Sequence, residues 1–262
     1  MRVLTVMRPF LLAFLLAACG AEAPAPSDVG ADWPEEPPVP GRRDWDPSAG
    51  TIALRGVVRF EGEPPARKPV DMGGDPACCS RHEKPVLSET YVVGPEGGFA
   101  NVFVQVTGGL EGWRFPRAEG DALLDQRGCV YVPHVLSLEV GQTLRVRNSD
   151  PILHNVHGYT LKDDREFCNW GQAAQGREDS RQMRKPGILA MKCDVHGWMQ
   201  AYVCVAPHPF HAVTGEDGAF TLPPLPPGTY VVEAWHEKLG TRTAEVVLAE
   251  GAPAEVSFAF SR

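Results

Sequence analysis

The chain has 262 residues, 43% of them hydrophobic and 22% charged, with 33 acidic and 25 basic side chains and a net charge of −8. This length is typical of a protein with more than one small domain. The acidic balance argues against nucleic-acid binding, which needs basic patches. The sequence offers neither a Gly-rich phosphate loop nor a credible Ser-His-Asp set, which disfavours a kinase or a hydrolase.

The N-terminal residues have the pattern of a signal peptide. Arg2 and Arg8 precede the apolar run 10–15, and the small residues LAACG follow at 16–20. The apolar run is too short to span a bilayer well. The LAAC tetrad resembles a bacterial lipobox, which implies cleavage after residue 18 and a lipid on Cys19. An ordinary cleaved signal is the alternative.

The lipobox resemblance also implies a location. Gly20, rather than Asp, follows the lipidated cysteine, which favours the outer membrane if the cell is Gram-negative. We therefore expect a protein of the cell envelope that faces the periplasm or the cell surface. Removal of residues 1–18 takes away two arginines and no acid, which changes the net charge from −8 to −10.

Residues 19–49 are predicted to be a tether, because the stretch is rich in Pro, Ala and acids and has no apolar periodicity. Such a chain stays extended, with a reach of at most about 3.1 Å per residue. The rest of the chain is long enough for two small domains.

From residue 50 onward, alternating apolar and polar residues predict strands separated by turns. The turn signals are Glu61-Gly62, Gly141-Gln142 and Asp217-Gly218, and the run 223–228 (PPLPPG) predicts a rigid connection between two strands. Turns at such short intervals predict an all-β protein built of sandwiches or barrels. The clearest alternating runs are 51–60, 100–106, 136–146 and 199–205.

The run 192–199 (KCDVHGWM) places a thiol, an imidazole and a thioether within seven residues. They converge only if the segment leaves a strand at Cys193 and forms a tight loop. A thiolate, imidazoles and a long axial thioether are the ligands of an electron-transfer copper site. The predicted ligands of one mononuclear copper are Cys193, His196, Met199 and, from a distant part of the chain, His154.

His154 lies in the run 148–155 (NSDPILHN), and Asn155 beside it is expected to tie this loop to the cysteine loop. His157 is the main rival for the first histidine position, and we place it beside the ligands or at the surface. Trp198 is expected either to form an apolar rim for a partner or to pack between domains.

The same residues exclude related sites. A binuclear copper site needs a second cysteine four positions from Cys193, where the chain has Leu189 and Gly197, and the sequence has no His-x-His pair for a multicopper oxidase. Zinc prefers a closed tetrahedral set without methionine. With four protein ligands the copper has no position for a substrate, so we expect an electron carrier and not an enzyme.

The segment 121–206 resembles a cupredoxin, the plastocyanin and amicyanin family. The runs 131–133, 136–142 and 144–150 follow the first strands of that family in order, and the Cys-x2-His-x2-Met loop matches the short amicyanin type. The resemblance implies a Greek-key β-sandwich with one type 1 copper, Cu(I) or Cu(II), which exchanges electrons with an unknown redox partner protein.

The segment from residue 213 resembles a carboxypeptidase regulatory-like domain, which is a transthyretin-type sandwich. The resemblance rests on the runs 213–220 and 225–230, and the usual first strand of such domains appears upstream, at 56–62. We therefore predict a discontinuous sandwich of residues 50–112 and 207–262, with the cupredoxin inserted. Two sandwiches in series are the alternative.

Five cysteines remain besides Cys19 and Cys193, and export permits disulfides. Cys168 and Cys204 both lie in the cupredoxin segment, and we predict that they pair. Cys129 is expected to pair with Cys78 or Cys79.

Three functions remain open from the sequence. The leading hypothesis is a lipid-anchored blue-copper electron carrier, held at the membrane by its N-terminal lipid. A copper-binding module for storage or delivery shares the same ligands. A metal-free structural or ligand-binding surface lipoprotein is disfavoured, because such a role does not require the four ligands.

Overall fold

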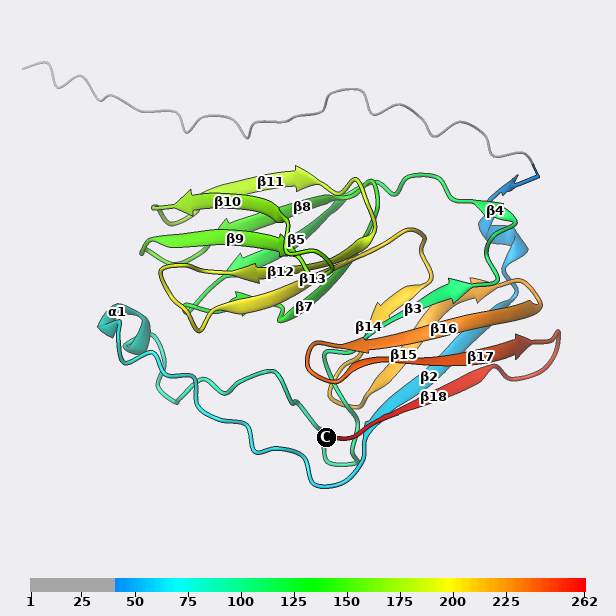
Figure 1. Ribbon diagram of the computed structural model, residues 1–262, viewed down its shortest axis with the longest axis horizontal. Coiled ribbons are helices and arrows are strands. Elements are labelled where there is room, and N and C mark those ends of the chain that lie inside the picture. The colour runs from blue at the N-terminus through cyan, green and yellow to red at the C-terminus, as the bar shows by residue number, and fades with distance from the viewer. Residues whose placement is uncertain (1–40) are drawn as a thin grey trace, which may run out of the picture.

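The computed structural model describes residues 41–262, which form two β-sandwiches (Figure 1). The predicted all-β class is confirmed: within these residues the helices are a 3-10 turn, Pro47–Ala49, and the short α1, Pro76–Cys79. No helix in this part of the chain is long and apolar enough to cross a membrane. The predicted signal peptide, Cys19 and most of the tether lie outside the described residues.

Sandwich A consists of residues 121–206 in two sheets. Its five-stranded sheet has the order β10 (Glu166–Gln172), β9 (His154–Thr160), β12 (Gly187–Lys192), β13 (Gln200–Ala206), β7 (Val135–Glu139). Its four-stranded sheet has the order β11 (Glu178–Gln182), β8 (Thr143–Asn148), β5 (Asp121–Gln126), β6 (Tyr131–Val132).

Sandwich B takes its strands from both sides of sandwich A in the sequence. Its four-stranded sheet has the order β14 (His211–Val213), β3 (Phe103–Gly108), β16 (Gly228–His236), β17 (Gly240–Leu248). The three-stranded sheet has the order β15 (Ala219–Leu225), β2 (Ile52–Phe60), β18 (Glu255–Phe260). β2 and β3 thus precede sandwich A, and β14 to β18 follow it. A small parallel pair, β1 (Arg43–Asp44) and β4 (Trp113–Arg114), lies beside sandwich B.

Strand alternation produces one core in each sandwich, because successive side chains point to opposite faces of a sheet. In β18 the burial alternates strictly, with Val256, Phe258 and Phe260 inside. A third cluster joins the two sandwiches: Phe103 and Trp235 of sandwich B pack with residues of sandwich A that include Tyr202. The buried ion pair His134–Glu237, 2.6 Å, also crosses this interface.

The structure corrects the prediction that the run 223–228 is a connection between strands. Pro223 and Pro224 belong to β15 rather than to a connection, and they stand where the register with β2 shifts between Leu222 and Leu225. Proline is tolerated there because β15 is the edge of its sheet and a register shift needs no regular ladder bond.

The connection between β2 and β3, residues 61–102, extends away from sandwich B and reaches sandwich A, where it forms α1 (Figure 1). The disulfide Cys78–Cys129 holds it there, across 51 residues of sequence. We call residues 75–82 of this connection the cap segment.

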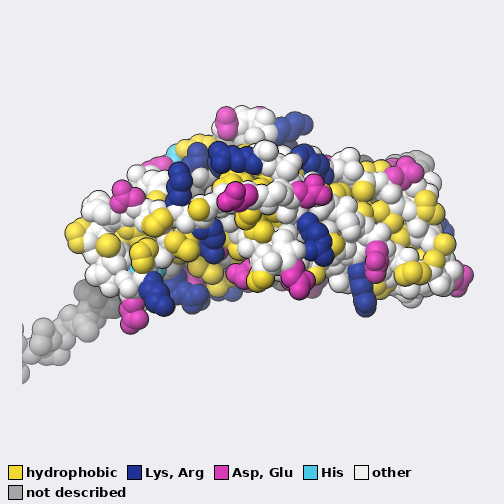
Figure 2. Space-filling model, turned by 90° about the horizontal axis from the view of Figure 1, so that it is seen from below, with side chains coloured by type: hydrophobic (Ala, Val, Ile, Leu, Met, Phe, Trp, Pro, Cys, Tyr) yellow, Lys and Arg dark blue, Asp and Glu magenta, His cyan; other side chains and the backbone are white. Residues whose placement is uncertain are grey.

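Figure 2 shows one face of the molecule, on which acidic and basic side chains alternate, so that this face presents both signs of charge.

Candidate metal centre

Two adjacent strands bring the predicted ligands to one end of sandwich A. β9 begins at His154, and its antiparallel neighbour β12 ends at Lys192, directly before Cys193. The loop after Cys193 returns into β13, and its turn is closed by a hydrogen bond from the Met199 N–H to the His196 carbonyl, 2.9 Å. Residues 42 positions apart therefore meet because β9 and β12 pair.

The ligand atoms of His154, Cys193 and His196 lie within 4.8 Å of one another. The two Nδ1 atoms are 3.0 Å apart, and Cys193 Sγ is 3.7 Å from Nδ1 of His196. The three residues are 0%, 3% and 2% exposed, in that order. Two imidazole nitrogens and a sulfur that face one point inside the protein fit a copper ion.

Met199 is 1% exposed and belongs to the same core cluster as Cys193. It follows Trp198 in the loop that leads into β13. The structure thus keeps the thioether in the interior, where a soft sulfur is available as a ligand.

The outer nitrogen of each histidine is held by a carboxylate. Nε2 of His154 is 3.0 Å from Asp150, and Nε2 of His196 is 3.0 Å from Asp75. A carboxylate that accepts from Nε2–H leaves Nδ1 free as a ligand, so both rings are turned toward the centre.

Sequence reasoning missed both carboxylates. Asp150 is four residues before His154, a local signal that a search for partners of the first histidine would find. Asp75 is 121 residues from His196 and has no such signal.

Burial and hydrogen bonds have opposite effects on the pKa values of the groups in the centre. Burial raises the pKa of Cys193, but hydrogen bonds from His154 and from the backbone of Asn155, His196 and Val195 lower it to about 7. Burial likewise raises the pKa of Asp150, whereas hydrogen bonds from His154, Cys129 and Gly128 lower it to about 2. Burial lowers the pKa of His154, but its contacts with Asp150 and Cys193 raise it above the usual value. A thiolate at neutral pH is the form that binds a metal.

The predicted neighbours of the ligands have distinct places. The Asn155 N–H donates to Cys193 Sγ, 3.4 Å, and its side-chain oxygen accepts from the Asp194 N–H, 3.2 Å, so this residue joins the two ligand loops. His157 points away from the ligands and contacts Asp194 and Glu166 at 2.8 and 3.0 Å. Trp198 is half-buried, packs against the core cluster of sandwich A and donates to the Cys129 carbonyl of the same sandwich, 3.0 Å.

The predicted disulfide between Cys168 and Cys204 is wrong, because both are free thiols. They lie on β10 and β13, and β9 and β12 stand between these strands in the sheet. Three strand spacings amount to about 14 Å, far beyond the reach of a disulfide. They also belong to different core clusters. Cys129 pairs with Cys78, and Cys79 is exposed and free.

The remaining histidines do not join the centre. Within residues 41–262, each compact His, Cys and carboxylate cluster includes His154 or His196. His208 and His236 each contact a backbone carbonyl, at 2.9 and 2.8 Å.

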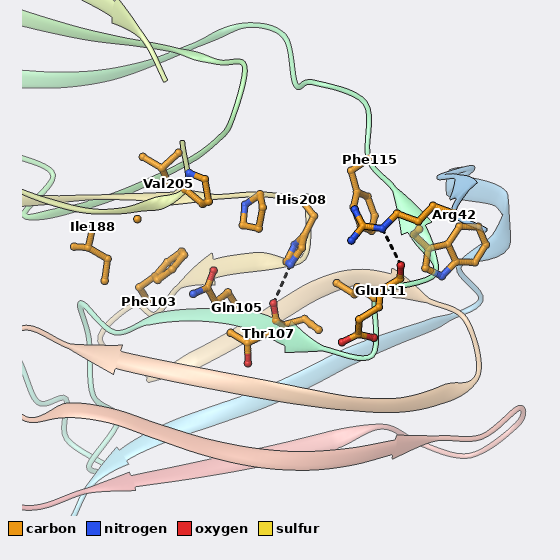
Figure 3. A pocket seen from close by; sticks show the side chains of 15 residues that line it. Arg42, Phe103, Gln105, Thr107, Glu111, Phe115, Ile188, Val205 and His208 are labelled. Atoms are coloured by element: carbon orange, nitrogen blue, oxygen red, sulfur yellow. Dashed lines mark hydrogen bonds between the residues drawn. The ribbon is translucent and has the colours of Figure 1, made fainter. Parts of the chain in front are cut away.

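A cavity of about 500 Å³ lies beside β3, apart from the centre, and is lined by residues of both sandwiches (Figure 3). His208 and Phe115 point into it, and Arg42 contacts the Glu111 carbonyl at its rim (Figure 3). None of its lining residues is a predicted ligand.

The fold and the donor set thus define an all-β protein with a buried centre of one sulfur and two imidazoles. The family model of the carboxypeptidase regulatory-like domain matches residues 199–261, which contain β13 and all strands from β14 to β18. No curated protein matches the chain.

Among the similar solved structures are cupredoxins and a copper-containing nitrite reductase. Amicyanin from Paracoccus versutus is 16% identical, over 32% of this chain and 78% of that one, with a TM-score of 0.29. A purple cupredoxin from Nitrosopumilus maritimus is 19% identical, over 32% and 99%, with a TM-score of 0.29. A copper-containing nitrite reductase from Thermus scotoductus is 19% identical, over 38% and 25%, with a TM-score of 0.29. Both families that the sequence resembles are thus found among the matches. What we infer about the metal centre is derived from the residues of this chain alone.

Proposed function

We propose that the protein is a mononuclear copper protein that transfers electrons and is anchored to a membrane by a lipid on Cys19. The observation that carries the proposal is the convergence of His154 Nδ1, His196 Nδ1 and Cys193 Sγ within 4.8 Å in the protein interior. Copper, when bound, supplies a one-electron couple between Cu(I) and Cu(II).

The residues of the chain support transfer rather than catalysis or delivery. His154, Cys193 and His196 are nearly inaccessible to solvent, and Met199 of the same loop is buried as well. Both imidazoles are held at Nε2, so they keep their direction when the charge of the centre changes. A module for copper delivery needs ligands that a partner protein can reach, and this site buries them.

The remaining parts of the proposal come from the sequence. The LAAC tetrad at 16–19 supports lipidation of Cys19, and the proline-rich residues after it support a tether that lets the folded part reach a redox partner protein.

The test is the visible spectrum of the protein without residues 1–19 after addition of Cu(II). We expect an intense thiolate-to-copper band that ascorbate bleaches, with one electron taken up per protein. Cys193→Ser is expected to abolish the band. Cys168→Ser is the matched control, because Cys168 is also a buried free thiol of the same core cluster, and it should leave the band unchanged.

Two results would contradict the proposal. A colourless protein that binds copper weakly and releases it to a chelator within seconds would indicate delivery. A protein that binds no copper would rule out the metal centre.

A further inference from the structure

The cap segment, although it belongs to a connection between strands of sandwich B, lies directly against the metal centre of sandwich A. Asp75 Oδ2 is 3.0 Å from His196 Nε2, and the His196 side chain is 2% exposed. Residue 75 lies outside the segment 121–206 that carries the four predicted ligands. The centre is therefore contacted by a residue from another part of the chain.

The Asp75 carboxylate is fixed in direction by its second oxygen. Oδ1 accepts the backbone N–H of Ala77 at 2.8 Å and that of Cys78 at 3.3 Å, so Asp75 is the N-cap of α1. One oxygen is thus bound to the cap segment and the other to His196. A carboxylate that is held at both oxygens cannot rotate away from the imidazole.

The cap segment is joined to sandwich A by three further contacts. Cys78 forms the disulfide with Cys129, His82 Nε2 is 2.7 Å from the Gly128 carbonyl, and Arg81 is 3.5 Å from Asp150.

These contacts link the two histidine partners. Asp150 accepts the N–H groups of Gly128 and Cys129, each at 2.8 Å, and its contact with His154 holds the other imidazole. The partners of both histidines therefore form one connected structure, made of the cap segment and residues 128–150.

We propose that Asp75 is a positioning residue for the metal centre. It accepts a hydrogen bond from the Nε2–H of His196, which keeps the proton off Nδ1 and directs Nδ1 at the metal. The inference rests on the proposed function, because it assigns His196 as a ligand. It adds that the connection between β2 and β3, which lies outside the segment 121–206, supplies a residue that positions a ligand.

The test compares Asp75→Ser with Asp71→Ser. Serine keeps the N-cap of α1 but is too short to reach His196. Asp71 is the matched control, because it lies in the same connection, contacts only the Gly73 N–H, at 2.9 Å, among the hydrogen bonds described, and loses the same charge. The Cu(I) affinity is measured by competition with a chromophoric chelator. We expect it to fall by about 10- to 100-fold in Asp75→Ser and to stay unchanged in Asp71→Ser.

A second readout does not depend on copper. Two-bond ¹H–¹⁵N spectra of the metal-free protein report which nitrogen of His196 carries the proton. We expect Nε2–H in the wild type and a mixture in Asp75→Ser. In Asp75→Asn the single side-chain oxygen accepts the Ala77 and Cys78 N–H groups, so the amide N–H₂ faces Nε2. We therefore expect this variant to shift the proton to Nδ1 and to lower the affinity at least as much as Asp75→Ser.

The outcomes separate the two proposals. If the wild type shows the thiolate-to-copper band but Asp75→Ser has wild-type affinity and an unchanged tautomer, the inference is overturned and the proposed function stands. If the wild type binds no copper, both are overturned. Should Asp75→Ser not fold, a proton on Nδ1 of His196 in the wild type would itself overturn the inference.

Discussion

The three buried thiols of sandwich A differ in how readily they ionise, and their neighbours explain the difference. Burial raises the pKa of Cys168 to about 12 and that of Cys204 still further. Cys193 is also buried, but hydrogen bonds to its sulfur lower its pKa to about 7. At neutral pH a large share of Cys193 is therefore thiolate, whereas the other two remain thiols and pack as small apolar side chains.

His211, far from the centre, is a test of how burial affects stability. Its Nδ1 is buried without a hydrogen-bond partner, and its ring packs against Phe103 at 6.0 Å between centroids. Burial, with a smaller contribution from His208, lowers the pKa of His211 from 6.5 to about 4. The unfolded chain thus binds a proton between these pH values that the folded protein does not bind.

The predicted consequence is a loss of stability in acid. Above pH 6.5 His211 is neutral in both states and does not weaken the folded protein. As the pH falls from 6.5 to 4, protonation of the unfolded chain lowers the free energy of unfolding by roughly 2–3 kcal/mol. His211→Phe is expected to remove this part of the pH dependence and to leave the free energy of unfolding at pH 7 within about 1 kcal/mol. Urea unfolding followed by tryptophan fluorescence at pH 7, 5.5 and 4 measures both. The prediction would be refuted if the free energy of unfolding changed with pH by the same amount in the wild type and in His211→Phe.

At the scale of elements, the turns of sandwich B are specified by glycines. Gly218 in the turn before β15 has a φ of +70°, and its carbonyl accepts the N–H of Val58 at 2.8 Å. A Cβ at Gly218 would lie 2.1 Å from the Val58 carbonyl oxygen. Gly62, directly after β2, has a φ of +84° but nothing within 4 Å of the added atom. Both positions have the left-handed backbone that disfavours other residues, but only Gly62 has room for a side chain.

Gly62→Ala is expected to cost about 1 kcal/mol, because only the left-handed backbone is penalised. Gly218→Ala is expected to cost a further 1–3 kcal/mol, roughly, because β2 must move away from the turn. The free energies of unfolding in urea provide the comparison. If the two variants lose equal stability, the close approach of Gly218 to β2 is not present in the protein.

On the scale of the whole molecule, the two sandwiches are joined by the shared cluster around Phe103 and Trp235, by His134–Glu237 and by the cap segment. Glu237 also accepts a hydrogen bond from the Tyr202 hydroxyl at 3.1 Å. Its two partners, His134 and Tyr202, belong to sandwich A, so both sandwiches must be folded before the buried carboxylate is hydrogen-bonded. The Cys78–Cys129 disulfide adds a covalent cross-link between the cap segment and sandwich A.

Loss of this link is expected to destabilise the whole protein. The disulfide spans 51 residues, for which the loop-closure estimate is about 4 kcal/mol. The double variant Cys78→Ser, Cys129→Ser should lose stability of this order in urea unfolding, and dithiothreitol should have the same effect on the wild type. Cys79→Ser is the control, because Cys79 is exposed and free, and it should change nothing. A double variant as stable as the wild type would mean that the cap segment stays in place without the bond.

Local patterns in the sequence predicted the parts that depend on neighbouring residues. Alternation in the run 51–60 corresponds to β2, Ile52–Phe60, and the run 199–205 corresponds to β13, Gln200–Ala206. The spacing of Cys193, His196 and Met199 indicated a tight loop after a strand, because the loop lies within one short segment. The run 136–146 became two strands, β7 and β8, divided at the predicted turn Gly141-Gln142.

Contacts between distant residues became known only from the folded arrangement. Cys168 and Cys204 are close in neither strand order nor face, whereas Cys78 reaches Cys129 through a long connection. Asp75 contacts His196 for the same reason. Strand identity and the ligand loop follow from side chains a few residues apart, so both could be predicted from local patterns. Contacts between distant segments depend on sheet order and on the path of connections, for which a single sequence carries no local signal.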